Sequence, residues 1–195
     1  MVPMRCMRLS STDRRELLAL ARESIERALE LGACALYPQR QHSLVQQEHR
    51  ASFVTLRLKG ELRGCCGSMD ATRPLAEDVW RNAWTSAFRD PRFAPLTAAE
   101  CADTHLHVSV LHPLEQLPAL QEEALLAQLR PDIDGLVLEL GAARATFLPS
   151  VWAQFPDPRA FVRHLKLKAG WSAEFWSPQM RAWRYLTEGF GDGEM

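Results

Sequence analysis

The chain has 195 residues, of which 47% are hydrophobic and 24% are charged, and its formal net charge is -1. This composition excludes a disordered chain and suffices for one sizeable hydrophobic core. The nearly balanced charge lacks the basic excess of a dedicated nucleic-acid-binding protein. We therefore expect a globular protein that binds no nucleic acid.

The chain also lacks the signals of a membrane or secreted protein. No apolar run approaches the roughly 18 residues of a membrane-spanning helix, and residues 1–7 lack the apolar stretch of a signal peptide. Its five cysteines are odd in number and irregularly spaced; they are Cys6, Cys34, Cys65, Cys66 and Cys101. This pattern predicts reduced thiols, a cytoplasmic location and no membrane partner.

The first predicted element is an amphipathic helix. A Ser-Thr-Asp run at 11–13, followed by Glu16, is typical of a helix start with a capping box. Apolar residues then recur at helical spacing as far as Gly32. The polar segment 37–50 predicts a loop.

A hairpin and a second helix are expected next. Residues 52–58 are rich in β-formers, and Lys59-Gly60 makes a plausible turn into residues 61–68. A helix is predicted over residues 74–88, where a proline stands at its start and apolar residues share one face.

The remaining pattern mixes short strands and helices without regular alternation. Strands are predicted at 104–111, 136–140, 144–148 and 180–187, and helices at 118–129, 149–155 and 157–169, with a helical turn at 97–100. Such an order favours an α+β fold with a largely antiparallel sheet flanked by helices.

The densest patch of unusual chemistry is the segment Leu-Arg-Gly-Cys-Cys-Gly at residues 62–67. In an extended strand, Arg63 and Cys65 share one face, whereas Cys66 lies on the other. A guanidinium two residues from a thiol favours the nucleophilic thiolate. We therefore name Cys65 and Arg63 as candidate catalytic residues; a purely structural Cys65 has equal weight, because cysteine is often buried.

Five further residues are candidates for substrate binding. Gly64 and Gly67 let a ligand or another backbone approach closely. Asp90, Arg92 and Glu100 could line a pocket with Arg63. The favoured alternative is structural: Asp90-Pro91 is good turn chemistry, and Arg92 would pair with a carboxylate to hold the loop.

His105 and His107 share a face of the strand expected at 104–111. Two imidazoles at this spacing could bind a metal ion. Solvated histidines on a sheet surface are the commoner explanation, so no metal site is predicted, and no cofactor follows from the sequence.

The hexapeptide resembles the LRGCIG signature of the AMMECR domain, also called AmmeMemoRadiSam system protein A. The resemblance extends in order over about residues 12 to 190. It includes the family's DxRFxPLTxxEL segment at 90–101, its VSVL strand at 108–111, its TFLP turn at 146–149 and its KAG helix end at 168–170. Such ordered agreement is more specific than a single motif.

The resemblance implies one α+β domain over residues 12–190 with a smaller lobe, between short tails at 1–11 and 191–195. It also implies a shared pathway with a Memo-like protein and a radical S-adenosylmethionine protein, and candidate active-site roles for the residues at Cys65 and Arg63. Two positions depart from the family pattern: Cys66 replaces isoleucine, and His107 replaces a frequent carboxylate.

Two functions follow as expectations. The first is an enzyme or enzyme component that uses the Cys65 thiolate on a small substrate. The alternative is a non-catalytic module of the same system that binds a protein or a metabolite.

Overall fold

The computed structural model describes residues 8–192, so Cys6 lies outside the described residues. The chain divides into two compact units: unit 1 is Met1–Leu111 with Glu188–Met195, and the smaller unit 2 is His112–Thr187. Each unit has its own four-stranded sheet and its own hydrophobic core. The predicted α+β fold with antiparallel pairing, flanking helices and a smaller lobe is confirmed.

Unit 1 begins with α1, Ser11–Leu31. Its N-cap is Ser10, whose hydroxyl accepts the Asp13 N–H at 3.1 Å while the Asp13 carboxylate accepts the Ser10 N–H at 2.9 Å. The capping box therefore has Asp13 rather than Glu16 as its partner, three residues earlier than predicted, and Glu16 instead accepts the side-chain amide of Gln46. The helix ends as predicted at Gly32, which adopts the left-handed conformation.

The sheet of unit 1 has the order β2-β1-β3-β8. Its strands are β1 (Ser52–Leu58), β2 (Glu61–Gly67), β3 (Thr104–Leu111) and β8 (Thr187–Gly191). The predicted hairpin turn is present, with positive φ at both Lys59 and Gly60, as a type I′ turn requires. Because β2 pairs only with β1, it forms one edge of the sheet.

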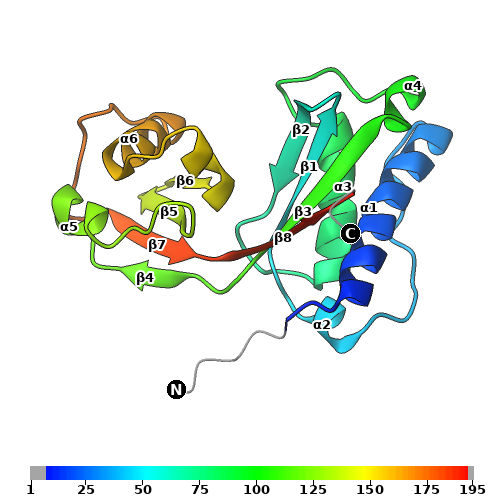
Figure 1. Ribbon diagram of the computed structural model, residues 1–195, viewed down its shortest axis with the longest axis horizontal. Helices are drawn as coiled ribbons and strands as arrows, with labels where there is room; N and C mark the ends of the chain where they lie inside the picture. Colours follow the sequence, from blue (N-terminus) through cyan, green and yellow to red (C-terminus); the bar gives the residue numbers. More distant parts are fainter. Residues whose placement is uncertain (1–7, 193–195) are drawn as a thin grey trace. The chain divides into compact units, whose positions relative to one another are not determined.

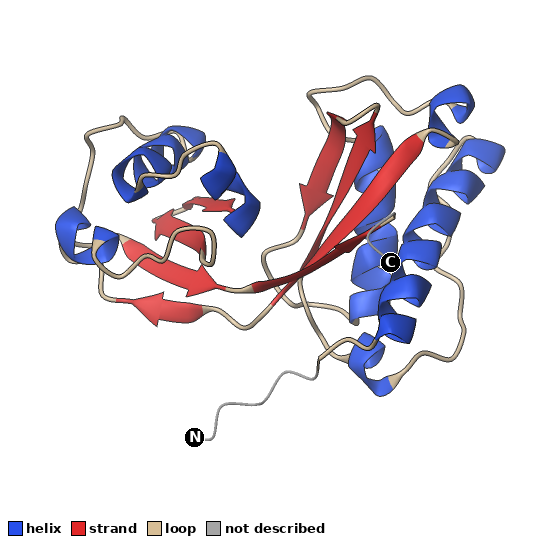
Figure 2. Cartoon of the chain, in the orientation of Figure 1, coloured by secondary structure: helices blue, strands red, loops and turns tan. Residues whose placement is uncertain are grey.

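One face of this sheet packs against α1 and α3, as Figures 1 and 2 show. Helix α3 spans Leu75–Phe88, and two short helices, α2 (Leu44–Gln47) and α4 (Ala98–Cys101), lie in connecting segments. The core between these layers includes Leu17, Ile25, Val54, Leu56, Val79, Ala83, Val108 and Val110.

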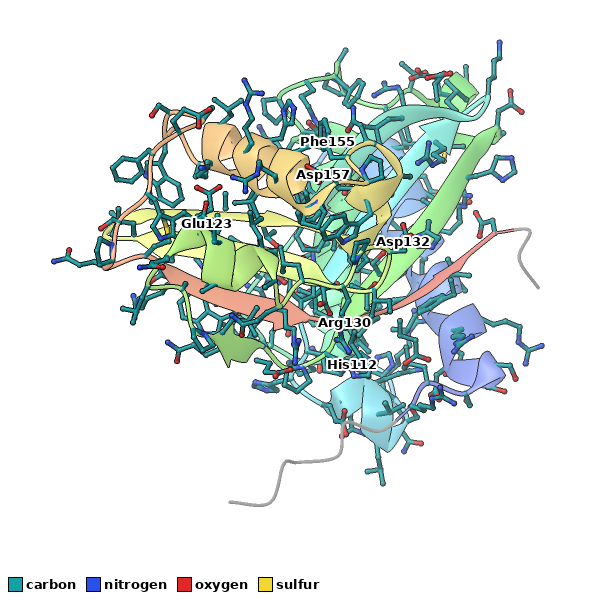
Figure 3. The ribbon with its side chains drawn as sticks, turned by 60° about the vertical axis from the view of Figure 1, so that its left-hand side comes forward. His112, Glu123, Arg130, Asp132, Phe155 and Asp157 are labelled. Atoms are coloured by element: carbon teal, nitrogen blue, oxygen red, sulfur yellow. The ribbon has the colours of Figure 1, made fainter. Side chains whose placement is uncertain are left out.

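Unit 2 folds around a second sheet, of order β4-β7-β5-β6. Its elements are β4 (Glu115–Leu117), α5 (Glu122–Leu126), β5 (Gly135–Leu140), β6 (Ala143–Phe147), the 3-10 helix η1 (Pro149–Ala153), α6 (Pro158–Lys168) and β7 (Arg181–Tyr185). In Figure 3, Glu123 marks α5 and Asp157 marks the start of α6.

Aromatic stacking and one buried ion pair hold the core of unit 2. The rings of Trp152 and Phe161 stack with centroids 3.8 Å apart, and the Trp152 indole donates to the Asp134 carbonyl at 2.7 Å. The ammonium of the buried Lys166 pairs with Glu122 at 2.8 Å, which links α6 to α5.

Three parts of the predicted pattern differ from the structure, the first being the expected loop 37–50, which contains the short helix α2. The helix expected at 118–129 is limited to Glu122–Leu126 and is preceded by β4, which sequence reasoning missed. The last predicted strand, 180–187, is two strands, because the chain leaves one sheet at Tyr185 and enters the other at Thr187. The hydrophobic periodicity of a segment predicts that the chain is extended there. It does not predict which sheet the strand joins.

Within residues 8–192, no helix is both long and apolar enough to cross a lipid bilayer.

Helix α3 approaches the sheet closely at Gly64. A Cβ atom added to Gly64 would overlap the backbone carbonyl oxygen of Ser86 on α3. The Ser86 hydroxyl also accepts the Cys66 N–H at 2.8 Å and donates to the Val54 carbonyl at 2.7 Å. One residue of α3 therefore contacts both strands of the hairpin, and this contact requires glycine at position 64.

We predict that Gly64→Ala destabilises the protein by about 3 kcal/mol, because the obstructing atom is backbone and cannot rotate away. Urea unfolding followed by circular dichroism measures the loss. Leu62→Ala, on the same strand and 36% exposed, is the control and should cost well under half as much. A second change, Ser86→Gly, should not rescue Gly64→Ala; rescue would show that the obstruction is a side-chain clash.

Candidate functional site

All seven predicted site residues lie in unit 1, on β2 or on the segment that follows α3. Arg63, Gly64, Cys65 and Gly67 belong to β2. The other three, Asp90, Arg92 and Glu100, lie in the segment 90–100. The structure therefore brings the two halves of the predicted site together, although 22 residues or more separate them in sequence.

The segment 90–92 covers the open edge of β2 at Cys65. The Asp90 carboxylate accepts the Cys65 N–H at 2.9 Å, and the Arg92 guanidinium donates to the Cys65 carbonyl at 3.2 Å. An edge strand normally leaves such groups free to pair with another chain. Here both main-chain groups of Cys65 are bonded, so the backbone that carries the thiol is fixed.

Asp90 is itself held by Arg92. The guanidinium of Arg92 donates to both oxygens of the Asp90 carboxylate, at 2.9 Å and 2.7 Å. These hydrogen bonds, together with the hydrogen bond from the Cys65 N–H, lower the pKa of Asp90 to about 2 against the opposing effect of burial. Asp90 is therefore a charged acceptor throughout the neutral range.

Arg63 is bound to Glu100 rather than standing free beside Cys65. Its Nε and Nη2 donate to the two carboxylate oxygens of Glu100 at 2.9 Å and 3.1 Å. Glu100 also closes the capping box of α4 by accepting the Thr97 N–H. The hydrogen bonds from Arg63 lower the pKa of Glu100 to about 2. The remaining nitrogen, Nη1 of Arg63, is buried and has no hydrogen-bond partner among the described residues.

The Cys65 side chain lies on the sheet face opposite α3, as the period of the strand predicts. Its register partner on β1 is Thr55, whose hydroxyl donates to the Cys65 sulfur at 3.3 Å. The thiol is half-buried and free. Among the described cysteines, Cys34 is exposed and Cys101 is buried, so the four thiols differ widely in access.

Cys66 occupies the opposite face, where its amide contacts Ser86 of α3. Burial raises the pKa of the Cys66 thiol, and the negative charge of Asp90 raises it further. Cys66 is therefore a neutral packing group at physiological pH.

Protein atoms fill the space beside each of the two glycines of the predicted site. The backbone of Ser86 occupies the space beside Gly64, and the Phe53 ring occupies the space beside Gly67. The sequence allowed either a ligand or another backbone beside Gly64. In the structure, the backbone of α3 occupies this position.

The histidines form no metal site with other ligands. Within residues 8–192, no group of three or more His, Cys, Asp or Glu side chains could hold a metal ion. His107 is, however, the register partner of Thr55 on β3, so Cys65, Thr55 and His107 lie in one row across three strands.

Sequence reasoning missed Thr55 and Ser86. Ser86 could have been found, because its hydroxyl lies among the alanines on the apolar face of α3. A buried hydroxyl needs a hydrogen-bond partner. Thr55 gave no such signal, because its role depends on which residue of β2 it faces.

The fold and this edge-strand site define a two-unit α+β protein with a half-buried thiol beside a paired arginine. A model of the AMMECR1 family matches residues 18–190. The chain belongs to the AMMECR1 family.

Relatives and a solved structure agree with this assignment. A protein of Methanothermobacter thermautotrophicus is 34% identical, over 93% of this chain and 95% of its own length. One from Thermofilum pendens is 35% identical, over 87% and 84% respectively. The crystal structure of the uncharacterized protein PH0010 from Pyrococcus horikoshii matches with a TM-score of 0.85 and 29% identity, covering 92% of this chain and 91% of that one.

We predict that Asp90→Asn lowers the free energy of unfolding at pH 7 by about 2 kcal/mol, from the depression of the Asp90 pKa from 3.8 to about 2. Because the folded pKa is depressed, this contribution is present above pH 4 and is lost as the pH falls toward 2. Urea unfolding at several pH values should therefore show the variant and the wild type converging in acid.

Asp103→Asn is the matched control, since Asp103 is an exposed carboxylate of the same unit. The free energy of unfolding of Asp103→Asn should differ little from that of the wild type at every pH. A gap for Asp90→Asn that is constant from pH 7 to pH 2.5 would contradict the assignment of this stabilisation to the Asp90 charge.

Proposed function

We propose that this protein is an enzyme or an enzyme component in which the sulfur of Cys65 attacks a small substrate. The observation that carries the proposal is the setting of the thiol: a fixed backbone, partial exposure and a hydroxyl donor, Thr55, at 3.3 Å from sulfur. A donor at this position would stabilise the thiolate, which is the form of sulfur that attacks; the charge then passes to the substrate as the new bond forms.

Arg63 supports a small anionic or carbonyl substrate. It lies two residues from Cys65 on the same strand, and its Nη1 has no hydrogen-bond partner among residues 8–192. Because Nη1 is buried, a substrate oxygen would reach it only after the Arg63 side chain moves, whereas the positive charge of the guanidinium attracts an anionic or carbonyl oxygen without such a movement. Asp90 and Arg92 would then act by fixing the strand, and Glu100 by orienting Arg63.

Membership of the AMMECR1 family supports a pathway shared with a Memo-like protein and a radical S-adenosylmethionine protein. These two are the partners that we propose for the chain.

A non-catalytic binding module is the second candidate, and the Arg63–Glu100 pair favours it. Two hydrogen bonds hold the guanidinium on α4, and the Phe93 ring lies 5.9 Å from the Arg63 guanidinium carbon. Such a fixed arrangement would also serve as a rigid recognition surface for a protein or metabolite.

The enzyme proposal predicts fast alkylation of Cys65 near neutral pH. Iodoacetamide labelling, resolved for each cysteine by mass spectrometry, should modify Cys65 at least about tenfold faster than Cys66 or Cys101. Thr55→Val should slow Cys65 several-fold. The exposed Cys34 is the internal standard, because its rate in the same molecules should not change.

Equal rates for Cys65 and Cys66 in the folded protein would refute a reactive thiol. A Thr55→Val variant that slows Cys34 as much as Cys65 would show that the change is not local.

Binding measurements separate the two candidates. Titration calorimetry with the purified Memo-like partner should compare Cys65→Ser, Arg63→Gln and Glu100→Gln. A binding module predicts that Cys65→Ser keeps wild-type affinity and full pathway function, whereas Arg63→Gln loses both. Glu100→Gln breaks the same ion pair, so it controls for the structural loss.

The enzyme proposal predicts instead that Cys65→Ser abolishes pathway function even where association is retained. Full pathway function in Cys65→Ser would reject it.

A further inference from the structure

Unit 1 contains a hollow of about 570 Å³ on its helical side. It lies between the C-terminal ends of α1 and α3, and Pro95 and Leu96 of the following loop close it. This volume is within the range of small-molecule sites. None of the predicted site residues lines it.

The wall of the hollow is largely apolar. Leu96 is buried, whereas Leu29, Trp84 and Phe88 are half-buried and so present part of their apolar surface to the hollow. An apolar group placed against such a wall gains the free energy of removing both surfaces from water. An ion or a fully polar ligand would gain no comparable free energy from contact with this wall.

One charged side chain, Arg89, lines the hollow. Arg89 is exposed, and its guanidinium carbon lies 5.3 Å from the centroid of the Trp84 ring. Within the described part of the chain, no carboxylate forms an ion pair with it. Arg81, two turns earlier on α3, differs in this respect, because it pairs with Glu77 at 2.9 Å.

We propose that this hollow binds a small amphiphilic anion, a molecule with an apolar body and one carboxylate or sulfonate group. The apolar body would pack against Trp84 and Leu96, and the anionic group would accept hydrogen bonds from the Arg89 guanidinium. Among the described residues no carboxylate lines the hollow, and the charge of Arg89 opposes the partial negative charge of the two helix C-termini.

The proposal does not depend on the chemistry of Cys65. The hollow could bind an anion whether unit 1 is catalytic or not, so failure of one proposal leaves the other standing.

Titration of the full chain with 1-anilinonaphthalene-8-sulfonate tests the proposal, because this probe joins an apolar body to one sulfonate. Saturable binding of one probe per chain is expected. Arg89→Gln should weaken it by about three- to tenfold, since a charge-assisted contact is lost. Arg81→Gln on the same helix should bind as the wild type does.

A neutral probe of similar shape, N-phenyl-1-naphthylamine, separates the charge from the apolar wall. Arg89→Gln should leave its affinity unchanged. Ala33→Glu, which places a carboxylate on the wall, should weaken the sulfonate probe more than the neutral one. Arg89→Lys keeps the cation, so it should retain most of the sulfonate affinity even if Arg89→Gln folds poorly.

Absence of saturable sulfonate binding would overturn the proposal. So would equal sulfonate affinities in Arg89→Gln and Arg81→Gln, which would place the probe elsewhere on the surface.

Discussion

The bond from the Cys65 amide to the Asp90 carboxylate is the contact on which the rest of the site depends. β2 is an edge strand, and its outward main-chain groups would otherwise face solvent or another strand. A buried carboxylate and its arginine partner bond both of these groups at Cys65. The thiol therefore stands on a backbone whose position is set by charge-assisted hydrogen bonds, which are stronger than neutral ones.

The same segment also determines where Arg63 lies. Residues 90–100 supply Asp90 to the strand and Glu100 to the arginine, so the hexapeptide and this segment form one structural assembly. α3 completes the assembly through Ser86, whose backbone reaches β2 at Gly64. A reactive thiol and a rigid recognition surface would both need this fixed geometry.

Much of the fold could be predicted from the sequence because its signals are local. The helix ending at Gly32, the Lys59-Gly60 turn and the strand Thr104–Leu111 depend on periodicity, caps and turn residues that lie within each segment. β4 and the division of the last strand could not be predicted, because they depend on which sheet each segment joins.

The candidate site likewise has features that the sequence predicts and features that depend on tertiary structure. The two faces of β2 followed from its period, so the separation of Cys65 from Cys66 was predictable. The sequence grouped Glu100 with Arg63 but did not predict their ion pair, and it gave no sign of Thr55 as the partner of Cys65, because tertiary pairing brings these residues together. The segment 90–92 was expected to hold a turn, and its second role, at the edge of β2, appears only in the structure. The catalytic roles of Cys65 and Arg63 remain predictions.

Hydrogen exchange at the Cys65 amide tests the central claim most directly. If Asp90 holds this amide, it should exchange slowly in the native protein despite its place on an edge strand. Asp90→Asn should then speed the exchange of the Cys65 amide by roughly tenfold or more beyond the increase at the Val54 amide on the neighbouring strand, which reports the loss of global stability alone. A Cys65 amide that exchanges as fast as an unprotected one in the wild type would contradict the account.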